Sequence, residues 1–142
     1  YETDLLVVEN LGEEKWIPRV VIEAKGNGEI NTHPAIAYSH KAATHRQVHP
    51  YLRYGILLGY RKHYPLPGRL FRHGTQFDFM ISWVKHEPTE KELEDTFDVL
   101  IKEVDASRTM ERIIYDSRKR SRDHYTVLQK ELKVWGKREK TL

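Results

Sequence analysis

Cysteine is absent from this 142-residue sequence, which excludes disulfides and any zinc site built on thiolates. Apolar runs long enough to span a bilayer are also missing, and no signal peptide opens the chain. Hydrophobic residues account for 39% of the sequence, enough to bury a core in one domain of ordinary size. We therefore expect a soluble, cytoplasmic protein that makes no membrane contact.

The charge is unevenly distributed, although the formal net charge is only +3. Residues 108–142 hold eleven lysines and arginines against five acidic residues, while residues 1–107 carry a surplus of acidic side chains. A basic tail beside a mildly acidic body indicates a polyanionic partner, and a solvated helix face is the simpler alternative. The chain opens on Tyr1 without a methionine, so we also expect a fragment that lacks an N-terminal part.

The first half of the sequence predicts an α/β fold. Two β-prone runs, residues 5–8 and 16–22, flank a polar turn and predict a hairpin. Residues 33–48 follow with apolar positions at helical spacing. Strand-like runs at 54–60 and 77–83 come next, and a strand–helix–strand order implies parallel pairing. The predicted architecture is a central mixed β-sheet flanked by helices.

The second half predicts a helical C-terminal extension. Pro88 and Thr89 open a helix with glutamates near its positive end and an apolar stripe behind them. A last helix is expected over residues 107–135, with hydrophobic residues along one side. We accordingly divide the chain into a core, residues 1–87, and a two-helix extension, residues 88–142. The apolar side of the last helix would either form a homodimer or cover the domain.

A charged triplet ends the second β-prone run. Alternate side chains of a strand share a face, so Glu23 and Lys25 point the same way. Asp4 lies at the edge of the first run, and a hairpin would bring it to the same end of the sheet. Two converging carboxylates suit Mg²⁺, and a nearby ammonium can orient a water or offset phosphate charge. The alternative is a surface ion pair on an edge strand beside an unrelated aspartate.

These residues resemble the motifs of the PD-(D/E)XK, or restriction-endonuclease-like, nucleases. Asp4 precedes Leu-Leu-Val-Val, and Glu-Ala-Lys at 23–25 follows Val-Val-Ile, which is similar to the family's D…(D/E)-x-K motif. Gln-Val-His-Pro-Tyr at 47–51 is similar to the Q-h-x-x-Y motif of the RecB-like branch. The resemblance covers residues 3–60 and rests on three motifs in the family's order.

The resemblance implies a restriction-endonuclease-like fold and a Mg²⁺-dependent endonuclease that hydrolyses DNA phosphodiester bonds. Such a protein would be the catalytic part of a restriction-type enzyme. By the same resemblance, Asp4 and Glu23 would bind Mg²⁺ together with the backbone carbonyl of Ala24. Lys25 would be the catalytic residue that positions the attacking water.

The resemblance also implies a catalytic role for Gln47 and a place for Tyr51 near the site, where it would contact the nucleic-acid backbone. Because the Q-h-x-x-Y motif leans toward nucleases that act on ends or branched DNA, a repair or recombination nuclease is one alternative. A non-catalytic nucleic-acid-binding or assembly module with a nuclease-like fold is another, suggested by the basic C-terminal segment.

Other basic side chains are candidates for contact with DNA phosphates, although each group also suits a solvated surface. Arg69, Arg72 and His73 flank Phe71, and predict either a loop inserted against nucleic acid or a hairpin with the ring in the core. Two further groups are Lys41, His45 and Arg46 in the predicted helix, and Arg118, Lys119, Arg120 and Arg122 near the C-terminus.

Overall fold

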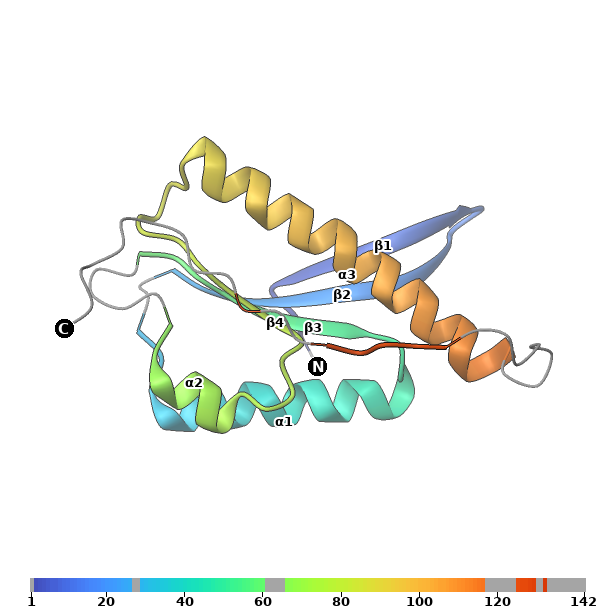
Figure 1. The fold of residues 1–142 in the computed structure, drawn as a ribbon, viewed down its shortest axis with the longest axis horizontal. Coiled ribbons are helices and arrows are strands. Elements are labelled where there is room, and N and C mark those ends of the chain that lie inside the picture. The colour runs from blue at the N-terminus through green and yellow to red at the C-terminus, as the bar shows by residue number, and fades with distance from the viewer. Residues whose placement is uncertain (1, 27–28, 61–65, 117–124, 130–131, 133–142) are drawn as a thin grey trace.

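The computed structural model describes residues 2–26, 29–60, 66–116, 125–129 and 132. Within them a four-stranded mixed sheet lies between two helical layers, with α1 and α2 on one face and α3 on the other (Figure 1). This arrangement confirms the predicted α/β class. The elements are β1 (Leu5–Gly12), β2 (Lys15–Lys25), α1 (Thr32–Val48), β3 (Arg53–Leu58), α2 (Gly68–His73), β4 (Phe79–Ser82) and α3 (Glu90–Asp116).

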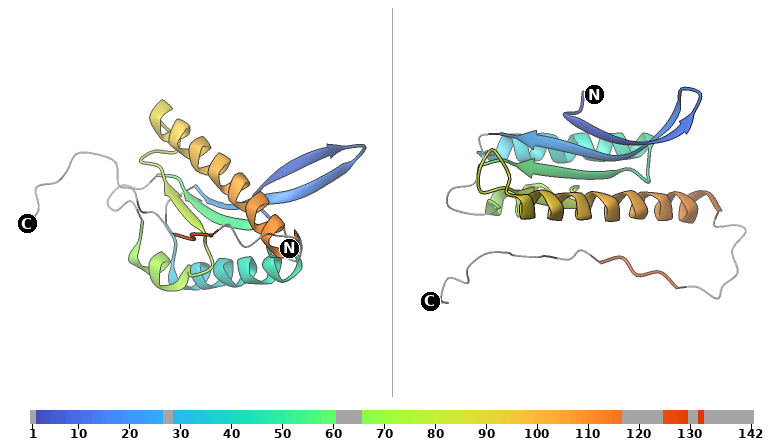
Figure 2. Two further views of the ribbon diagram at one scale, coloured as in Figure 1. Left: turned by 45° about the vertical axis from the view of Figure 1, so that its right-hand side comes forward. Right: turned by 90° about the horizontal axis from the view of Figure 1, so that it is seen from above.

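β1 and β2 form the predicted antiparallel hairpin, in which Leu5 lies opposite Ile22 and Gly12 opposite Lys15. Pairing of β2 with β3 begins only at Val20, so the tip of the hairpin extends beyond the sheet (Figure 2). β1 is an edge strand of this sheet. Several large apolar side chains of the hairpin are exposed, namely Leu5, Leu6, Val8, Leu11 and Trp16.

The remaining strands are parallel, and the sheet order is β1-β2-β3-β4. α1 connects β2 to β3, which confirms the predicted strand–helix–strand unit. The carboxyl ends of β2, β3 and β4 form one edge of the sheet, which runs across the strands. At this edge Lys25 pairs with Leu58, and Leu58 pairs with Ser82. β1 begins at that same edge, because it runs antiparallel to β2.

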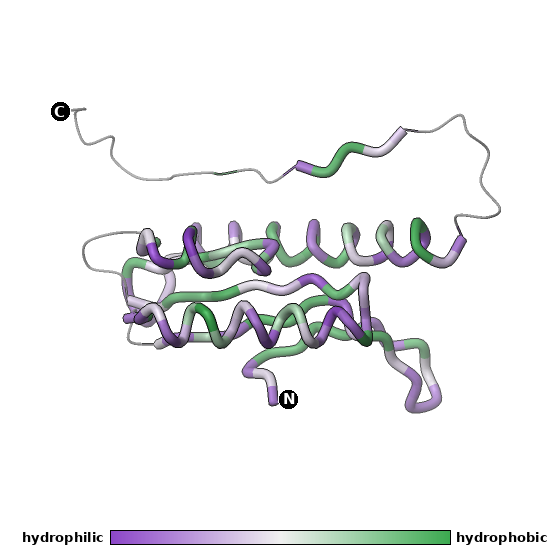
Figure 3. The backbone as a smooth tube through the Cα atoms, turned by 90° about the horizontal axis from the view of Figure 1, so that it is seen from below, coloured by the Kyte–Doolittle hydropathy of each residue, from purple (hydrophilic) through white to green (hydrophobic). Residues whose placement is uncertain are grey.

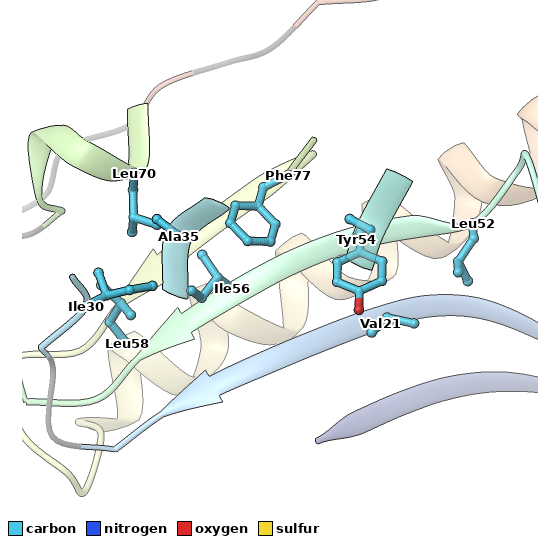
Figure 4. Packing of buried hydrophobic residues seen from close by; sticks show 10 residues of the cluster. Val21, Ile30, Ala35, Leu52, Tyr54, Ile56, Leu58, Leu70 and Phe77 are labelled. Carbon is cyan, nitrogen blue, oxygen red and sulfur yellow. The ribbon is translucent and has the colours of Figure 1, made fainter. Parts of the chain in front are cut away.

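Two hydrophobic clusters hold the layers together. On the α1 face, Ala35 and Ala42 have small side chains that let the helix approach Tyr54 and Ile56 of β3 closely (Figure 4). On the α3 face, residues of β2 and β4 are covered by apolar side chains of α3. Along the central strands hydrophobic residues follow one another, whereas polar and apolar residues alternate along α1 and α3 (Figure 3). Strands covered on both faces by helices have this composition.

α3 begins with a capping box and is tied to the sheet by buried charge. The Thr89 N–H donates to Glu92 Oε2 over 2.7 Å, and the Glu92 N–H donates to Thr89 Oγ1 over 3.2 Å. Arg19 of β2 is 3% exposed. Its guanidinium lies 2.7 Å from Glu9 of β1 and 2.7 Å from Glu111 of α3. One arginine therefore joins the hairpin, the sheet and the helix.

The predicted last helix over residues 107–135 is wrong. α3 continues without a break to Asp116, and Ser107, the expected start of a new helix, is fully buried within it. Residues 125–129 have no regular secondary structure. The apolar stripe keeps its period through residue 107, so the sequence pattern there does not distinguish one long helix from two. No helix in the described ranges combines the length and the apolar composition needed to cross a membrane.

The segment around Phe71 forms neither the loop nor the hairpin that the sequence predicted. It forms the short helix α2, in which Leu70 is buried and Phe71 is 55% exposed. Leu70 joins the cluster on the α1 face, so α2 is held by one apolar side chain and presents its basic residues outward.

Replacing Gly55 by alanine should destabilise the fold. A Cβ at Gly55 would lie 2.2 Å from the ring of Phe79, which is itself buried against Val20 and Ile22. We expect the free energy of unfolding to fall by about 1–3 kcal/mol, the usual cost of overpacking a core, as measured by urea denaturation. The control is Gly68→Ala, whose added Cβ has no atom within 4 Å. Equal effects of the two changes would contradict the close approach of β3 and β4.

Candidate active site

Glu23 of β2 is a buried carboxylate on the α1 face of the sheet, with 2% of its surface exposed. Its Oε1 atom accepts a hydrogen bond of 2.7 Å from the Tyr54 hydroxyl and lies 2.7 Å from Lys41 Nζ in an ion pair. Tyr54 comes from β3 and Lys41 from α1, so all three elements of the crossover unit converge on one oxygen atom. Direct partners of this kind offset the loss of hydration that a buried charge suffers.

Strand alternation and helix periodicity together produce this cluster. Glu23 lies two residues after Val21 on β2, and alternate side chains of a strand share a face. Val21 and Tyr54 pair in the ladder and both pack against α1, so Glu23 and Tyr54 point to the α1 face. On α1, Tyr38, Lys41 and His45 are three and four residues apart, so they lie on one side of the helix. That side faces β2 and β3, as the contact between Lys41 and Glu23 requires.

Asp4 lies one residue before β1, at the position that continues the ladder opposite Glu23, because Leu5 pairs with Ile22. The Asp4 Oδ2 atom accepts a hydrogen bond of 2.8 Å from the Ala24 N–H. In an antiparallel ladder the N–H and C=O groups of one residue point to the same neighbouring strand, so the Ala24 carbonyl also points to the side of β2 on which β1 lies. The hairpin thus brings Asp4 and Glu23 to the same end of the sheet.

Lys25 ends β2 on the same face as Glu23. Its ammonium lies 4.7 Å from the centroid of the Tyr38 ring, which is a cation–π contact. Lys25 forms no ion pair within the part of the chain that the structure describes. The ammonium group therefore lies at the edge of the sheet against an aromatic ring, and no carboxylate of the described residues neutralises it.

The electrostatics of the cluster are set by burial. Burial raises the pKa of Tyr54 and its hydrogen bond to Glu23 raises it further, so the hydroxyl stays protonated and is the donor. The His45 ring lies on Tyr54 with the centroids 5.6 Å apart, and desolvation lowers the pKa of His45. His45 is therefore mainly neutral at pH 7, and Lys41 supplies the positive charge beside Glu23.

The donor set fits a hard divalent cation. Asp4 and Glu23 offer carboxylate oxygens, the Ala24 carbonyl offers another, and Mg²⁺ usually keeps several waters beside one or two carboxylates. Both described partners of Glu23 contact Oε1, which leaves Oε2 outside these contacts. No group of three or more histidine, aspartate or glutamate side chains that could hold a metal occurs among the described residues. Two carboxylates and one backbone carbonyl are thus the described groups that would hold such an ion, and waters would complete its coordination.

The two residues of the Q-h-x-x-Y motif lie apart from this cluster. Gln47 is exposed near the end of α1, and its side chain makes no hydrogen bond to the described residues. Tyr51 is buried before β3, where Arg19 lies 5.5 Å from its ring centroid and Tyr115 of α3 lies edge-on at 6.4 Å. Because α1 ends at Val48, the two residues do not share a helix face. Their placement supports neither a catalytic Gln47 nor a Tyr51 beside the metal ligands.

The basic residues expected to contact nucleic acid from α1 turn inward. Arg46 donates hydrogen bonds of 2.6 Å to Asp78 Oδ2 and 3.1 Å to the Leu52 carbonyl, so its guanidinium holds the start of β3 and β4. Lys41 and His45 face the buried cluster, and none of the three is a free surface cation. The other expected group, Arg118, Lys119, Arg120 and Arg122, lies outside the described residues.

Sequence reasoning missed Tyr54 and Tyr38 as parts of the site. Both lie in apolar surroundings, and the sequence alone assigns them to the core. The signal that identifies Tyr54 is its place opposite Val21 in the parallel ladder, two residues before Glu23. Such a register follows from three-dimensional pairing and is not contained in the local pattern.

An open cavity of about 710 Å³ lies between the start of α1 and α2. Arg69, Arg72 and His73 of α2 line it, together with Asn31 and neighbouring residues of the segment that follows β2. Arg69 donates a hydrogen bond of 3.3 Å to Asn31 Oδ1. In Figure 1, α2 lies beside the beginning of α1, at the end of the sheet where β2 and β3 end. The cavity is thus close to the edge that carries Lys25.

No protein-family model, no curated protein and no solved structure matches this chain. The residues of the site and their geometry therefore carry the functional interpretation.

Tyr54→Phe should lower the free energy of unfolding by about 1–3 kcal/mol, because the buried Glu23 carboxylate loses a hydrogen-bond donor. Urea denaturation at pH 7 measures this loss. The matched control is Tyr38→Phe, which keeps the ring under Lys25 and removes a hydroxyl with no described hydrogen-bond partner. We expect the control to change stability by less than about 0.5 kcal/mol. Similar losses in both variants would refute the bond to Glu23 as the cause.

Proposed function

We propose that this protein is a Mg²⁺-dependent endonuclease that hydrolyses DNA phosphodiester bonds, as the catalytic part of a restriction-type enzyme. The observation that carries the proposal is the convergence of Asp4 and Glu23 at one end of the β1–β2 pair, with Lys25 on the same face as Glu23. The donor set and the parallel crossover after β2 support the resemblance to PD-(D/E)XK nucleases. The proposal goes beyond the fold class, since other α/β proteins share a mixed sheet between helices.

In this proposal Asp4, Glu23 and the Ala24 carbonyl hold the ion. When bound, Mg²⁺ would polarise a phosphoryl oxygen and acidify a water. Lys25, oriented by the Tyr38 ring, positions the attacking water and offsets the charge that develops on the phosphate. The water would attack phosphorus and lose a proton to solvent, while the bond from phosphorus to the oxygen of the departing strand breaks. That oxygen takes a proton from solvent, so no covalent bond to the protein forms.

A non-catalytic nucleic-acid-binding module is the second candidate, and one observation favours it. Glu23 already has a cation and a hydroxyl donor at hydrogen-bond distance, so its charge is compensated without a metal. This candidate predicts salt-dependent DNA binding with no uptake of divalent ions. The repair-nuclease alternative has no comparable support, because Gln47 and Tyr51 lie apart from the cluster.

The cavity beside α2 supports a path for the DNA backbone. Its lining includes residues that follow Lys25 closely in the chain. Two arginines and a histidine of α2 also line it. Phosphates beyond the cleaved bond would meet these side chains, which give affinity without reading the bases.

The full chain should cleave plasmid DNA with Mg²⁺ and lose this activity in EDTA. We expect Asp4→Asn, Glu23→Gln and Lys25→Met each to slow cleavage by about 100-fold or more, since each removes a group that acts on the reacting phosphate or holds the ion. Initial rates of supercoiled DNA loss measure this, and circular dichroism checks that each variant is folded.

Lys91→Met is the control for these variants, because Lys91 lies exposed on α3, where it pairs with Asp95. It should cleave at the wild-type rate. If the three site variants also kept the wild-type rate, the hydrolytic proposal would be rejected. Salt-dependent DNA binding without Mg²⁺ uptake would then favour the non-catalytic module.

Arg69→Ala and Arg72→Ala should weaken DNA binding through lost phosphate contacts. In the Glu23→Gln background, which prevents cleavage, we expect each change to reduce the slope of log affinity against log salt by about one. Fluorescence anisotropy over a range of salt concentrations measures the slope. Arg112→Ala on α3 is the control with the same loss of charge. A slope equal to that of the control would exclude the cavity from the DNA path.

A further inference from the structure

The ion pair between Lys41 and Glu23 lies where the proposed metal would bind. Lys41 Nζ is 2.7 Å from Glu23 Oε1, and the two side chains are 17% and 2% exposed. Lys41 belongs to α1, whereas Asp4 and Glu23 belong to the hairpin. The amine therefore reaches the carboxylate from the opposite layer of the domain.

The charges of this cluster balance without a metal ion. Asp4 and Glu23 contribute two negative charges, and Lys25 and Lys41 contribute two positive charges. A divalent ion bound by both carboxylates would add two positive charges within a few ångströms of Lys41. Like charges at such distances in a poorly solvated site repel strongly. The Lys41 ammonium and a divalent ion would therefore compete for the Glu23 carboxylate.

Lys41 also has a route away from Glu23. Its ammonium is carried on a flexible four-carbon stem, and the side chain is already partly exposed. It lies on the same side of α1 as Tyr38, whose ring holds Lys25 at the edge of the sheet. An amine that leaves Glu23 in this direction would meet the phosphate on which Lys25 acts.

We propose that Lys41 is the resident counter-ion of the metal site, that Mg²⁺ displaces it from Glu23, and that the released ammonium then binds the DNA phosphate. The inference rests on the proposed function, because it requires Glu23 to be a metal ligand. It assigns Lys41 two opposite effects: the residue weakens binding of the metal alone, and it strengthens binding of the substrate once the metal is bound.

Metal binding tests the first effect. Isothermal titration with Mg²⁺ in the absence of DNA should show that Lys41→Met binds the ion about tenfold more tightly than the wild type, a usual strength for coupled binding events. Lys91→Met is the matched control, since it removes the same charge from an exposed position on α3 that is not part of the cluster. We expect the control to change affinity by less than about threefold.

Single-turnover cleavage tests the second effect. At saturating Mg²⁺, Lys41→Met should cleave DNA about tenfold more slowly, despite its tighter metal binding, because a cation beside the phosphate is missing. If Lys41 had only a structural role, its replacement would lower both the metal affinity and the cleavage rate, because the whole cluster would loosen.

A measurement on the wild-type protein avoids dependence on a variant that fails to fold. Acylation of lysine amines followed by mass spectrometry should show that Lys41 reacts several-fold faster when Mg²⁺ is added. Lys91, which is 66% exposed on α3, is the internal reference and should not change. Unchanged reactivity of Lys41 at saturating Mg²⁺ would overturn the exchange.

The outcomes separate the inference from the proposed function. If Glu23→Gln binds Mg²⁺ as tightly as the wild type, Glu23 is not a ligand, and both proposals fall. If Mg²⁺ binding depends on Glu23 but is unchanged or weaker in Lys41→Met, the nuclease proposal stands and the counter-ion inference is wrong.

Discussion

Burial of the Glu23 carboxylate constrains the whole α1 face of the domain. A carboxylate that is 2% exposed is costly unless charged or hydrogen-bonding partners lie against it. Tyr54 and Lys41 meet this requirement from β3 and α1, so both elements must keep one register relative to β2. A slide of α1 by one turn would carry Lys41 past the carboxylate and leave both charges unpaired. The polar cluster thus specifies how an otherwise apolar helix–sheet interface is aligned.

The α3 face of the sheet carries the hydrophobic cluster of β2, β4 and α3. This cluster is bordered by ion pairs in which an arginine of the sheet joins acidic residues of other elements. Arg19 contacts Glu9 and Glu111, while Arg53 contacts Asp78 at 3.2 Å and Glu103 at 2.5 Å. Asp78 also contacts Arg46 of α1 at 2.6 Å, so these pairs join both helical layers to the sheet.

Local signals were sufficient for much of the fold. The hairpin, the helix after it and the start of α3 follow from alternation, period and a capping residue, all of which lie within a few positions of the chain. The end of α3 was not predictable in this way, because nothing in the pattern around Ser107 distinguishes one long helix from two. The convergence of Asp4 with Glu23 needed only the hairpin. The partners Tyr54 and Lys41 needed the register of a parallel ladder and the position of a crossover helix.

The Q-h-x-x-Y segment illustrates the limit of a spacing argument. Gln47 and Tyr51 have the separation that would place two side chains on one helix face, but that inference holds only while the helix continues. α1 ends at Val48, just before Pro50, and the chain turns toward β3. There Tyr51 packs against Arg19 and Tyr115.

The position of the site follows from the mixed topology of the sheet. β2 pairs antiparallel on one side and parallel on the other, so the start of β1 and the ends of β2, β3 and β4 all reach one edge. In an all-antiparallel meander a turn would join β2 to its next neighbour and cover that edge. Here the chain leaves the edge through α1 instead and returns at the other end of the sheet. Asp4, Glu23 and Lys25 therefore lie together at this edge. The cavity between α1 and α2 lies at the same end of the sheet, so the proposed metal ligands and the proposed DNA path share one edge.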